Sequence, residues 1–144
     1  MMKKQARILL QDGTRFAGYA TGMDGTASGE VCFNTGMTGY QEIFTDPSYK
    51  GQIMVTAASH IGNYGVTLNE SEHDKVQIAG LICRSFSDTA SRARSDQDLA
   101  SFLADNQTVA VSDVDTRALV RHLREKGSMN GVISTELDWE AMEV

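Results

Sequence analysis

Short apolar runs separated by turn residues fill the first half of the chain, and this alternation predicts β-strands. Asp12 and Gly13 follow the first run and form a dipeptide typical of a hairpin turn. Gly22, Gly25 and Gly29 indicate a glycine-rich loop before the third run. The strands expected from this pattern are Ala6 to Gln11, Thr14 to Ala20, Glu30 to Asn34, Gln52 to Ala57 and Val76 to Cys83.

The second half of the chain changes to a helical period. Leu99, Phe102 and Leu103 recur at the i, i+3 and i+4 positions of an amphipathic helix. Strands first and helices later favour an α+β layered domain over a doubly wound sheet. The elements expected here are a helix over Asp96 to Ala104, strands over Thr108 to Val111 and Met129 to Ser134, and a helix that begins within Asp138 to Glu143.

Another helix is expected to run from Arg117 to Lys126. Asp115 is the candidate N-cap, because a carboxylate there accepts a hydrogen bond from the free N–H groups of the first turn. Gly127 is a natural C-cap residue that ends the helix. The buried face of the helix is expected to carry Leu119 and Leu123.

Arg117, Arg121 and Arg124 fall on one stripe of this helix, at positions i, i+4 and i+7. Two interpretations stay open for the stripe. It is either a solvated charged face moderated by Asp113 and Glu125, or a docking stripe for an acidic partner surface. The sequence favours neither.

Composition places the chain among ordinary globular domains. With 144 residues, 41% of them hydrophobic, residues 1–144 fit one domain with a real core. The formal charge of −6 makes nucleic acid and anionic membrane surfaces poor partners. There is no apolar run long enough to cross a bilayer, and Asp12 interrupts the only apolar segment near the basic start, so a cytoplasmic location is expected.

Cys32 and Cys83 both lie in apolar, strand-like surroundings. They do not form a disulfide framework, they lack metal-ligand spacing, and we interpret them as small buried hydrophobic residues. A redox pair would require their two strands to be neighbours. The histidines, His60, His73 and His122, are too scattered to indicate a metal site. No acid or nucleophile near His60 completes a catalytic pair, so an independent hydrolase built around it has little support.

The densest polar signal is the segment from Phe33 to Tyr49, in which glycines, amides and hydroxyls interrupt an apolar strand. A backbone this polar must find partners if it is buried, so the segment is expected to line an interface or a site. Asp46 precedes Pro47, the only proline of the chain, and the pair predicts a tight turn that presents Ser48. Taken alone, a serine after Asp-Pro most often satisfies its own backbone.

Two other clusters accompany this motif: one spans His60 to Gly65, and one runs from Asp113 to Gly131. Together with the early Asp12-Gly13 turn, their order and spacing resemble the small subunit of glutamine-hydrolysing carbamoyl-phosphate synthase. The resemblance runs from about Leu10 to Ile133, which is most of the chain.

The resemblance implies a swivelling β/β/α fold and a place in a heterodimeric ligase. In the family, this domain is followed by a class I glutamine amidotransferase domain, where a Cys-His-Glu constellation releases ammonia from glutamine. The large subunit combines that ammonia with bicarbonate, using two ATP, and the carbamoyl phosphate feeds arginine and pyrimidine biosynthesis. ATP and a divalent metal are therefore expected on the large subunit, and no cofactor or metal on this chain.

The resemblance implies that this chain carries only the first of the two domains. Neither Cys32 nor Cys83 has the Gly-x-Cys-x-Gly setting of the amidotransferase nucleophile, so no catalytic residue is assigned and the fragment is expected to be inactive by itself. The resemblance implies one substrate-binding residue, Ser48, which would contact glutamine held by the second domain. It also implies that the domain helps to dock the small subunit onto the large one.

The chain departs from the family in two loops. Ala57-Ala58-Ser59 stands where a proline after tyrosine is common before His60, and Ser91-Arg92 lacks the usual aromatic residue. Both changes remove bulk or rigidity from loops, which affects local interface packing more than family membership. The alternative interpretation is a free-standing binding or scaffold module that keeps the fold without enzymatic activity.

Overall fold

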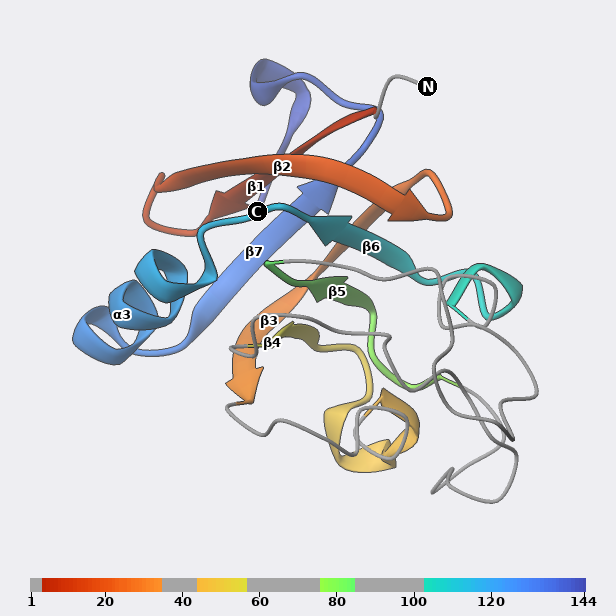
Figure 1. Cartoon of the computed structure of the whole chain (residues 1–144). Coiled ribbons are helices and arrows are strands. Elements are labelled where there is room, and N and C mark those ends of the chain that lie inside the picture. The colour runs from red at the N-terminus through yellow and green to blue at the C-terminus, as the bar shows by residue number, and fades with distance from the viewer. Residues whose placement is uncertain (1–3, 35–43, 57–75, 85–102) are drawn as a thin grey trace.

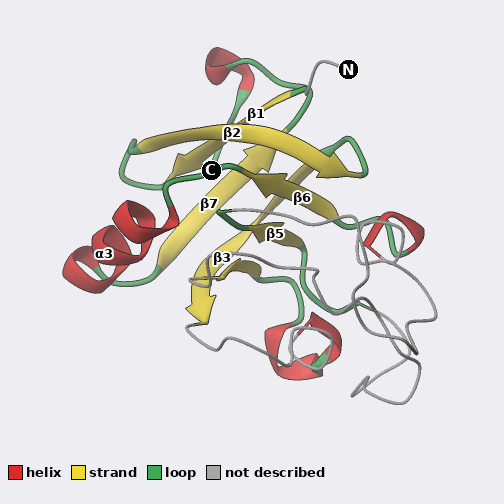
Figure 2. Ribbon diagram, in the orientation of Figure 1, coloured by secondary structure: helices red, strands yellow, loops and turns green. Residues whose placement is uncertain are grey.

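The computed structural model describes residues 4–34, 44–56, 76–84 and 103–144 (Figure 1). Within them, seven strands close into a barrel in the order β1-β2-β6-β5-β4-β3-β7 (Figure 2). Helix α3 (Thr116–Lys126) lies beside the barrel, and η1 (Pro47–Tyr49) and η3 (Trp139–Ala141) are single 3₁₀ turns. This strand-rich α+β architecture confirms the expected class. The strands are β1 (Gln5–Leu10), β2 (Arg15–Gly22), β3 (Thr26–Asn34), β4 (Ile53–Thr56), β5 (Gly80–Ile82), β6 (Val109–Ser112) and β7 (Met129–Ser134).

The sheet is mixed, with one parallel and one antiparallel part. Strands β3, β4, β5 and β6 run parallel to one another, whereas the pairs that involve β1, β2 or β7 are antiparallel. The sheet closes because β7 pairs with β1 on one side and with β3 on the other. The hairpin predicted at Asp12 and Gly13 is confirmed: β1 and β2 pair antiparallel, and Gly13 takes the positive φ of +90° that the turn requires.

Alternate residues of the parallel strands belong to two separate hydrophobic clusters. In β4, Ile53 and Val55 join a first cluster that connects strands around the barrel with α3, whereas Met54 joins a second cluster. All residues of β4, β5 and β6 are buried. Both faces of these strands are therefore covered, which is why they read as continuous apolar runs in the sequence.

Helix α3 confirms the capping that the sequence predicts. The Asp115 carboxylate accepts a hydrogen bond from the Ala118 N–H at 3.1 Å, and the Gly127 N–H donates to the Leu123 carbonyl at 2.8 Å. Leu119 and Leu123 are buried, as expected. Of the helix expected over Asp96 to Ala104, only its last two residues lie among those described, and both are helical.

One polar contact clamps α3 to the hairpin between β1 and β2. The His122 Nε2 lies 2.6 Å from the Asp12 Oδ2 and 3.3 Å from the Thr14 Oγ1. Because a carboxylate only accepts, Nε2 carries the proton that is donated to Asp12. The Asp12 Oδ1 in turn accepts the Thr14 N–H at 3.0 Å.

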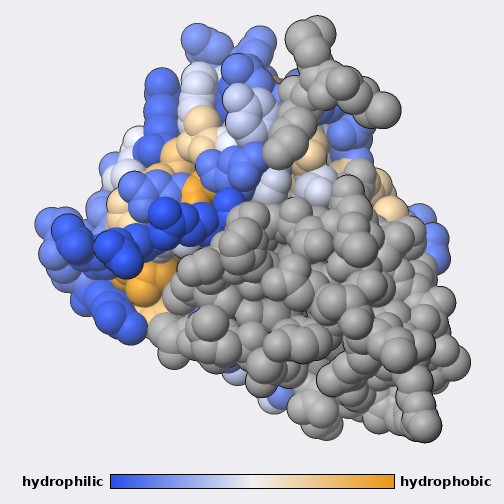
Figure 3. Space-filling model, in the orientation of Figure 1, coloured by the Kyte–Doolittle hydropathy of each residue, from blue (hydrophilic) through white to orange (hydrophobic). Residues whose placement is uncertain are grey.

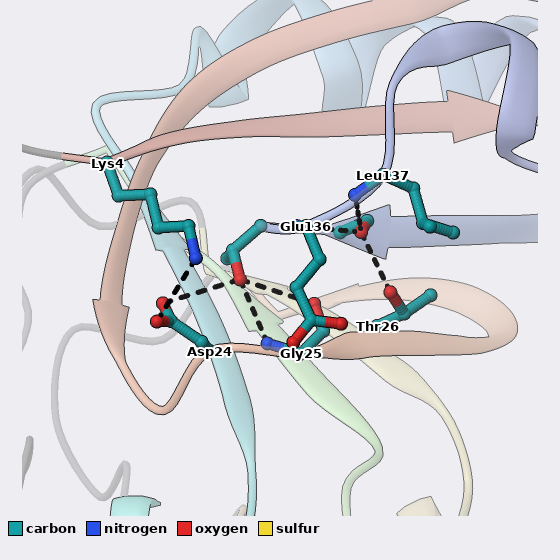
Figure 4. A network of polar contacts seen from close by, with 8 residues as sticks. Lys4, Asp24, Gly25, Thr26, Glu136 and Leu137 are labelled. Atoms are coloured by element: carbon teal, nitrogen blue, oxygen red, sulfur yellow. Dashed lines mark hydrogen bonds and ion pairs between the residues drawn. The ribbon is translucent and has the colours of Figure 1, made fainter.

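A second set of polar contacts ties the β2–β3 turn to the end of β7 (Figure 4). The Thr135 Oγ1 accepts the Gly25 N–H at 2.9 Å, and the Ser134 hydroxyl lies 2.8 Å from the Thr26 hydroxyl. Ser134 and Thr135 are buried, so these bonds satisfy hydroxyls that water does not reach.

The expected loop around Gly29 is wrong, because Gly29 lies inside β3 and pairs with Gly131 of β7. A Cβ atom at Gly29 would lie 2.2 Å from the Gly51 carbonyl oxygen. The glycine is there because another stretch of backbone passes close to β3. Gly22 likewise belongs to a strand, since it ends β2.

Strand β5 is shorter than the strand expected over Val76 to Cys83. The Gln77 N–H donates to the Phe44 carbonyl at 2.8 Å, and the Ala79 N–H donates to the Gln52 carbonyl at 2.8 Å. The segment before β5 therefore bonds to the residues around η1 instead of extending the β-ladder. The other expected strands are confirmed, with ends that shift by a few residues.

The helix expected to begin within Asp138 to Glu143 is only the 3₁₀ turn η3. Asp138 makes no capping hydrogen bond, because its Oδ1 lies 3.4 Å from the Arg7 Nη2 instead. The Arg7 Nη1 also donates to the Leu137 carbonyl at 3.2 Å. Contact with β1 thus replaces the helix cap. In the described part of the chain, none of the helices is long and apolar enough to span a membrane.

We predict that Gly29→Ala lowers the free energy of unfolding by roughly 1–3 kcal/mol, the usual cost of overpacking. The new methyl group would meet the Gly51 carbonyl oxygen, which is main chain and cannot rotate away. Ser28→Ala, at the exposed neighbouring position of β3, is the matched control and should change stability little. Urea unfolding of the three proteins checks this, and equal stability of wild type and Gly29→Ala would contradict the close approach.

We predict that the hairpin clamp weakens at acid pH. The Thr14 N–H lowers the pKa of Asp12 below its ordinary value of 3.8, with further contributions from the Thr14 hydroxyl and His122. A carboxylate whose folded pKa is depressed stabilises the fold above its unfolded pKa, and this stabilisation is lost as the pH falls through the folded pKa.

Urea unfolding of wild type and Asp12→Asn between about pH 7 and pH 3 tests this. Wild type should be more stable near neutrality by up to about 1 kcal/mol, the usual size of an exposed charge-assisted contact. The difference should shrink as the pH falls below 3.8. A difference that stays constant with pH would show that the charge of Asp12 plays no part.

Candidate functional site

Ser48 lies in the 3₁₀ turn η1, which is the tight turn predicted from Asp46 and Pro47. The Asp46 Oδ1 accepts the Ser48 N–H at 2.9 Å, and Pro47 occupies the first turn. The Tyr49 N–H donates to the Asp46 carbonyl at 3.0 Å. The ring of Pro47 and the cap of Asp46 thus fix the backbone before the serine, and the Tyr49 hydrogen bond fixes the backbone after it.

Buried residues hold this turn against the body of the domain. Phe44 is fully buried in the second hydrophobic cluster, and Tyr49 packs against the same cluster. After the turn, the Gly51 N–H donates to the Gln77 carbonyl at 3.0 Å. The close approach of Gly51 to Gly29 of β3 adds a further point of contact. Ser48 is therefore an exposed residue on an anchored segment.

The hydroxyl of Ser48 is exposed together with its residue. Among the described residues, none forms a hydrogen bond with the Ser48 Oγ, since only its N–H is engaged by Asp46. A serine hydroxyl both donates and accepts, so it can bind either polar end of an amino-acid ligand. The remaining residues of the motif at 35–43, and His60 with its neighbours, lie outside the described residues.

The two cysteines do not form a redox pair or a nucleophile. Cys32 is in β3 and Cys83 follows β5, and β4 lies between these two strands, so the neighbour condition is not met. Burial raises the pKa of Cys32 to about 11 and that of Cys83 to about 12. Glu30 adds to the rise at Cys32, and Asp113 adds to it at Cys83. Since the thiolate is the reactive form, neither group is activated.

The described residues contain no group of three or more histidine, cysteine or acidic side chains that could hold a metal ion. His122 is one of the three histidines of the chain, and its Nε2 faces Asp12 and Thr14. Its role here is structural, because it positions α3 against the hairpin. His60 and His73 lie outside the described residues.

The exposed face of α3 carries Arg117, Arg121 and Arg124, which we call the arginine stripe. Figure 3 shows strongly hydrophilic residues gathered over this helix. Arg124 is held in place by Phe33 of β3, because its guanidinium carbon lies 5.3 Å from the centre of the Phe33 ring. The structure thus confirms that the three residues share an exposed face.

A cleft of about 260 Å³ lies where β1, β2 and the end of β6 meet η3. Its lining includes Arg7, Tyr19, Asp113 and Trp139. Asp113 has a positive φ of 62°, a conformation that few non-glycine residues adopt. The sequence did not predict this cleft, because its residues come from four separate segments that only the fold brings together.

Comparison with known proteins identifies the class of this domain. A family model described as "Carbamoyl-phosphate synthase small chain, CPSase domain" matches residues 8–133. The chain therefore belongs to this family, which confirms the resemblance seen in the sequence. It is a domain of the carbamoyl-phosphate synthase small chain type.

Individual relatives agree with the family. The chain is 52% identical over 128 residues to the carbamoyl phosphate synthase small chain of Buchnera aphidicola subsp. Schizaphis graminum, which covers 89% of this chain and 33% of the relative. It is 52% identical over 132 residues to the small chain of Pectobacterium atrosepticum, and this match covers 92% of this chain and 35% of the relative. It is 49% identical over 134 residues to the small chain of Aquifex aeolicus, and this match covers 93% of this chain and 36% of the relative. The chain thus spans about one third of the length of these relatives.

A solved structure shows a similar fold in a protein of different sequence. An aminopeptidase from Aneurinibacillus sp. strain AM-1 matches with a TM-score of 0.51 and 14% identity, covering 93% of this chain and 31% of that one. At this identity the likeness concerns the fold alone.

We predict that both thiols react slowly in the folded protein. At pH 8 a pKa of about 11 in place of 9.0 leaves the Cys32 thiolate about a hundredfold rarer. Cys83 is also fully buried and should react only on unfolding. Labelling with Ellman's reagent, with and without guanidinium, measures this, and the Cys83→Ser variant isolates Cys32. Rapid labelling of a native thiol would contradict the burial described above.

Proposed function

We propose that this chain is the first domain of the small subunit of a glutamine-hydrolysing carbamoyl-phosphate synthase, and that it completes the glutamine site through Ser48. Family membership over residues 8–133 carries the proposal. The exposure of Ser48 on an anchored turn supports it, because a residue that completes a site on another domain must be accessible and held in position.

The proposed assembly has two further parts. A class I amidotransferase domain would follow this domain and release ammonia from glutamine, and a large subunit would use the ammonia, bicarbonate and two ATP to make carbamoyl phosphate. This product would serve arginine and pyrimidine biosynthesis in the cytoplasm. The proposal agrees with the length of the relatives, of which this chain covers 33–36% in the three cases above. ATP and its divalent metal would bind to the large subunit.

Ser48 would act by binding and not by chemistry. Its hydroxyl would exchange a hydrogen bond with a polar end of glutamine, while Asp46 and Pro47 hold the backbone so that little flexibility is lost on binding. The nucleophile would come from the amidotransferase domain, because the raised pKa of Cys32 and Cys83 leaves no activated thiol here. The isolated domain would then be inactive.

The swivelling β/β/α assignment belongs to the same proposal. It describes a unit built of two layers of strands and one layer of helix. The closed sheet and the α3 clamp give such a unit internal rigidity. Within the assembly, this domain would contribute binding surface to two partners, the amidotransferase domain and the large subunit.

We predict that Ser48→Ala, in the full small subunit assembled with its large subunit, raises the KM for glutamine roughly three- to tenfold, the value of one neutral hydrogen bond. Activity with free ammonia should not change, because ammonia enters after glutamine hydrolysis. Steady-state assays with each nitrogen donor make the comparison, and Ser128→Ala, another exposed serine, is the matched control.

Two results would count against the proposal. If Ser48→Ala lowers both activities equally, the turn serves folding and not glutamine binding. If the wild-type chain joins no large subunit and confers no glutamine-dependent synthesis, the domain is a free-standing module. The two results are distinguishable, because the first is seen only in the Ser48→Ala variant, whereas the second is seen with the wild-type chain.

A further inference from the structure

The arginine stripe combines three positive charges on one side of α3. Arg117, Arg121 and Arg124 are three or four positions apart, so each is a surface neighbour of the next. The opposite side of the helix buries Leu119 and Leu123 against the barrel. The stripe therefore cannot turn inward, and it faces away from the core.

Described residues of the domain form no ion pair with the stripe. In the residues that the structure describes, no carboxylate lies within ion-pair distance of the three guanidinium groups. Two other cations of the domain are paired: the Lys4 Nζ lies 3.2 Å from the Asp24 Oδ2, and the Arg7 Nη2 lies 3.4 Å from the Asp138 Oδ1. Like charges at helical neighbour positions repel, so the stripe opposes helix stability until an anionic partner covers it.

The stripe is held ready for such a partner. The cap at Asp115 and the contact between His122 and Asp12 fix the helix, and the ring of Phe33 supports Arg124. Guanidinium groups bind carboxylates with two parallel hydrogen bonds, so fixed arginines suit an acidic protein surface. The chain itself has a net charge of −6, and a basic stripe on an acidic domain favours one orientation of approach.

The stripe and Ser48 lie at opposite ends of the parallel strands. The Ser48 turn precedes β4, at its amino end, whereas Phe33 is one residue from the carboxyl end of β3 and lies beside Arg124. Because β3 and β4 are parallel and pair Phe33 with Val55, their carboxyl ends lie together. Figure 1 shows α3 and η1 on different sides of the barrel. Both surfaces can therefore be occupied at once.

We infer that the arginine stripe is a docking surface for an acidic face of the large subunit. The inference rests on the proposed function, because the Ser48 end is assigned to the amidotransferase domain and leaves the α3 end for the other partner. The contact would consist of carboxylates of the large subunit that pair with Arg117, Arg121 and Arg124.

Binding of the full small subunit to its large subunit tests this inference. We expect Arg117→Glu/Arg121→Glu to raise the Kd at least about tenfold at low salt, because attraction is replaced by repulsion. Lys126→Glu is the matched control: it makes the same type of charge reversal at an exposed residue of the same helix outside the stripe, and it should change the Kd less than about twofold. Binding should also lose part of its salt dependence in the double variant.

Each other outcome overturns the inference. An unchanged Kd in the double variant, or an equal rise in Lys126→Glu, would show that the stripe is not the contact. Thermal unfolding reports whether the variants fold, and Arg117→Gln/Arg121→Gln removes the charges without adding repulsion if the reversal unfolds α3. A wild-type subunit that does not bind the large subunit overturns the proposed function as well, and this is seen before any variant is made.

Discussion

Two glycines face each other across the seam that closes the barrel, Gly29 of β3 and Gly131 of β7. A Cβ atom at Gly131 would lie 2.8 Å from a methyl group of Val31, and one at Gly29 would lie 2.2 Å from the Gly51 carbonyl oxygen. Neither position has room for a side chain. The close packing of β7 against Val31 of β3 depends on Gly131, and the close approach of Gly51 to β3 depends on Gly29.

The same close approach connects the barrel to the candidate site. Gly51 lies two residues after the Ser48 turn, and it touches β3 only because Gly29 admits it. Phe44 before the turn and Tyr49 within it are held by the second hydrophobic cluster. An exposed hydroxyl thus obtains a defined position from buried contacts on both sides. Buried contacts on both sides of an exposed group are the kind of support that a precisely placed binding residue requires.

The positions of the Ser48 turn and the arginine stripe follow from the direction of the strands. In a set of parallel strands, the segments that lead into the strands all lie at one end of the sheet, and the segments that follow the strands all lie at the other end. The Ser48 turn enters β4, whereas α3 lies by Phe33, where β3 ends. A single small domain can therefore present different chemistry at its two ends, a neutral hydroxyl at one and a row of guanidinium groups at the other.

The sequence predicted most of the elements, because their signals are local. The hairpin at Asp12 and Gly13, the caps of α3 and the turn at Asp46 and Pro47 each depend on residues within a few positions of one another. The order and spacing of the motifs also indicated the family. The candidate role of Ser48 was inferred from that resemblance.

What the sequence missed depended on contacts between distant segments. From the sequence alone Gly29 resembles a loop residue, but in the fold Gly51 lies beside it. The segment from Asp138 to Glu143 resembles the start of a helix, but in the fold the Asp138 carboxylate pairs with Arg7. The barrel closure, the separation of the cysteines by β4 and the placement of the arginine stripe away from Ser48 were likewise decided by tertiary structure. The sequence by itself determined local conformation and family, because both depend on neighbouring residues and on the spacing of motifs. Only the fold decided which distant groups meet, because strand pairing and burial act across the whole chain.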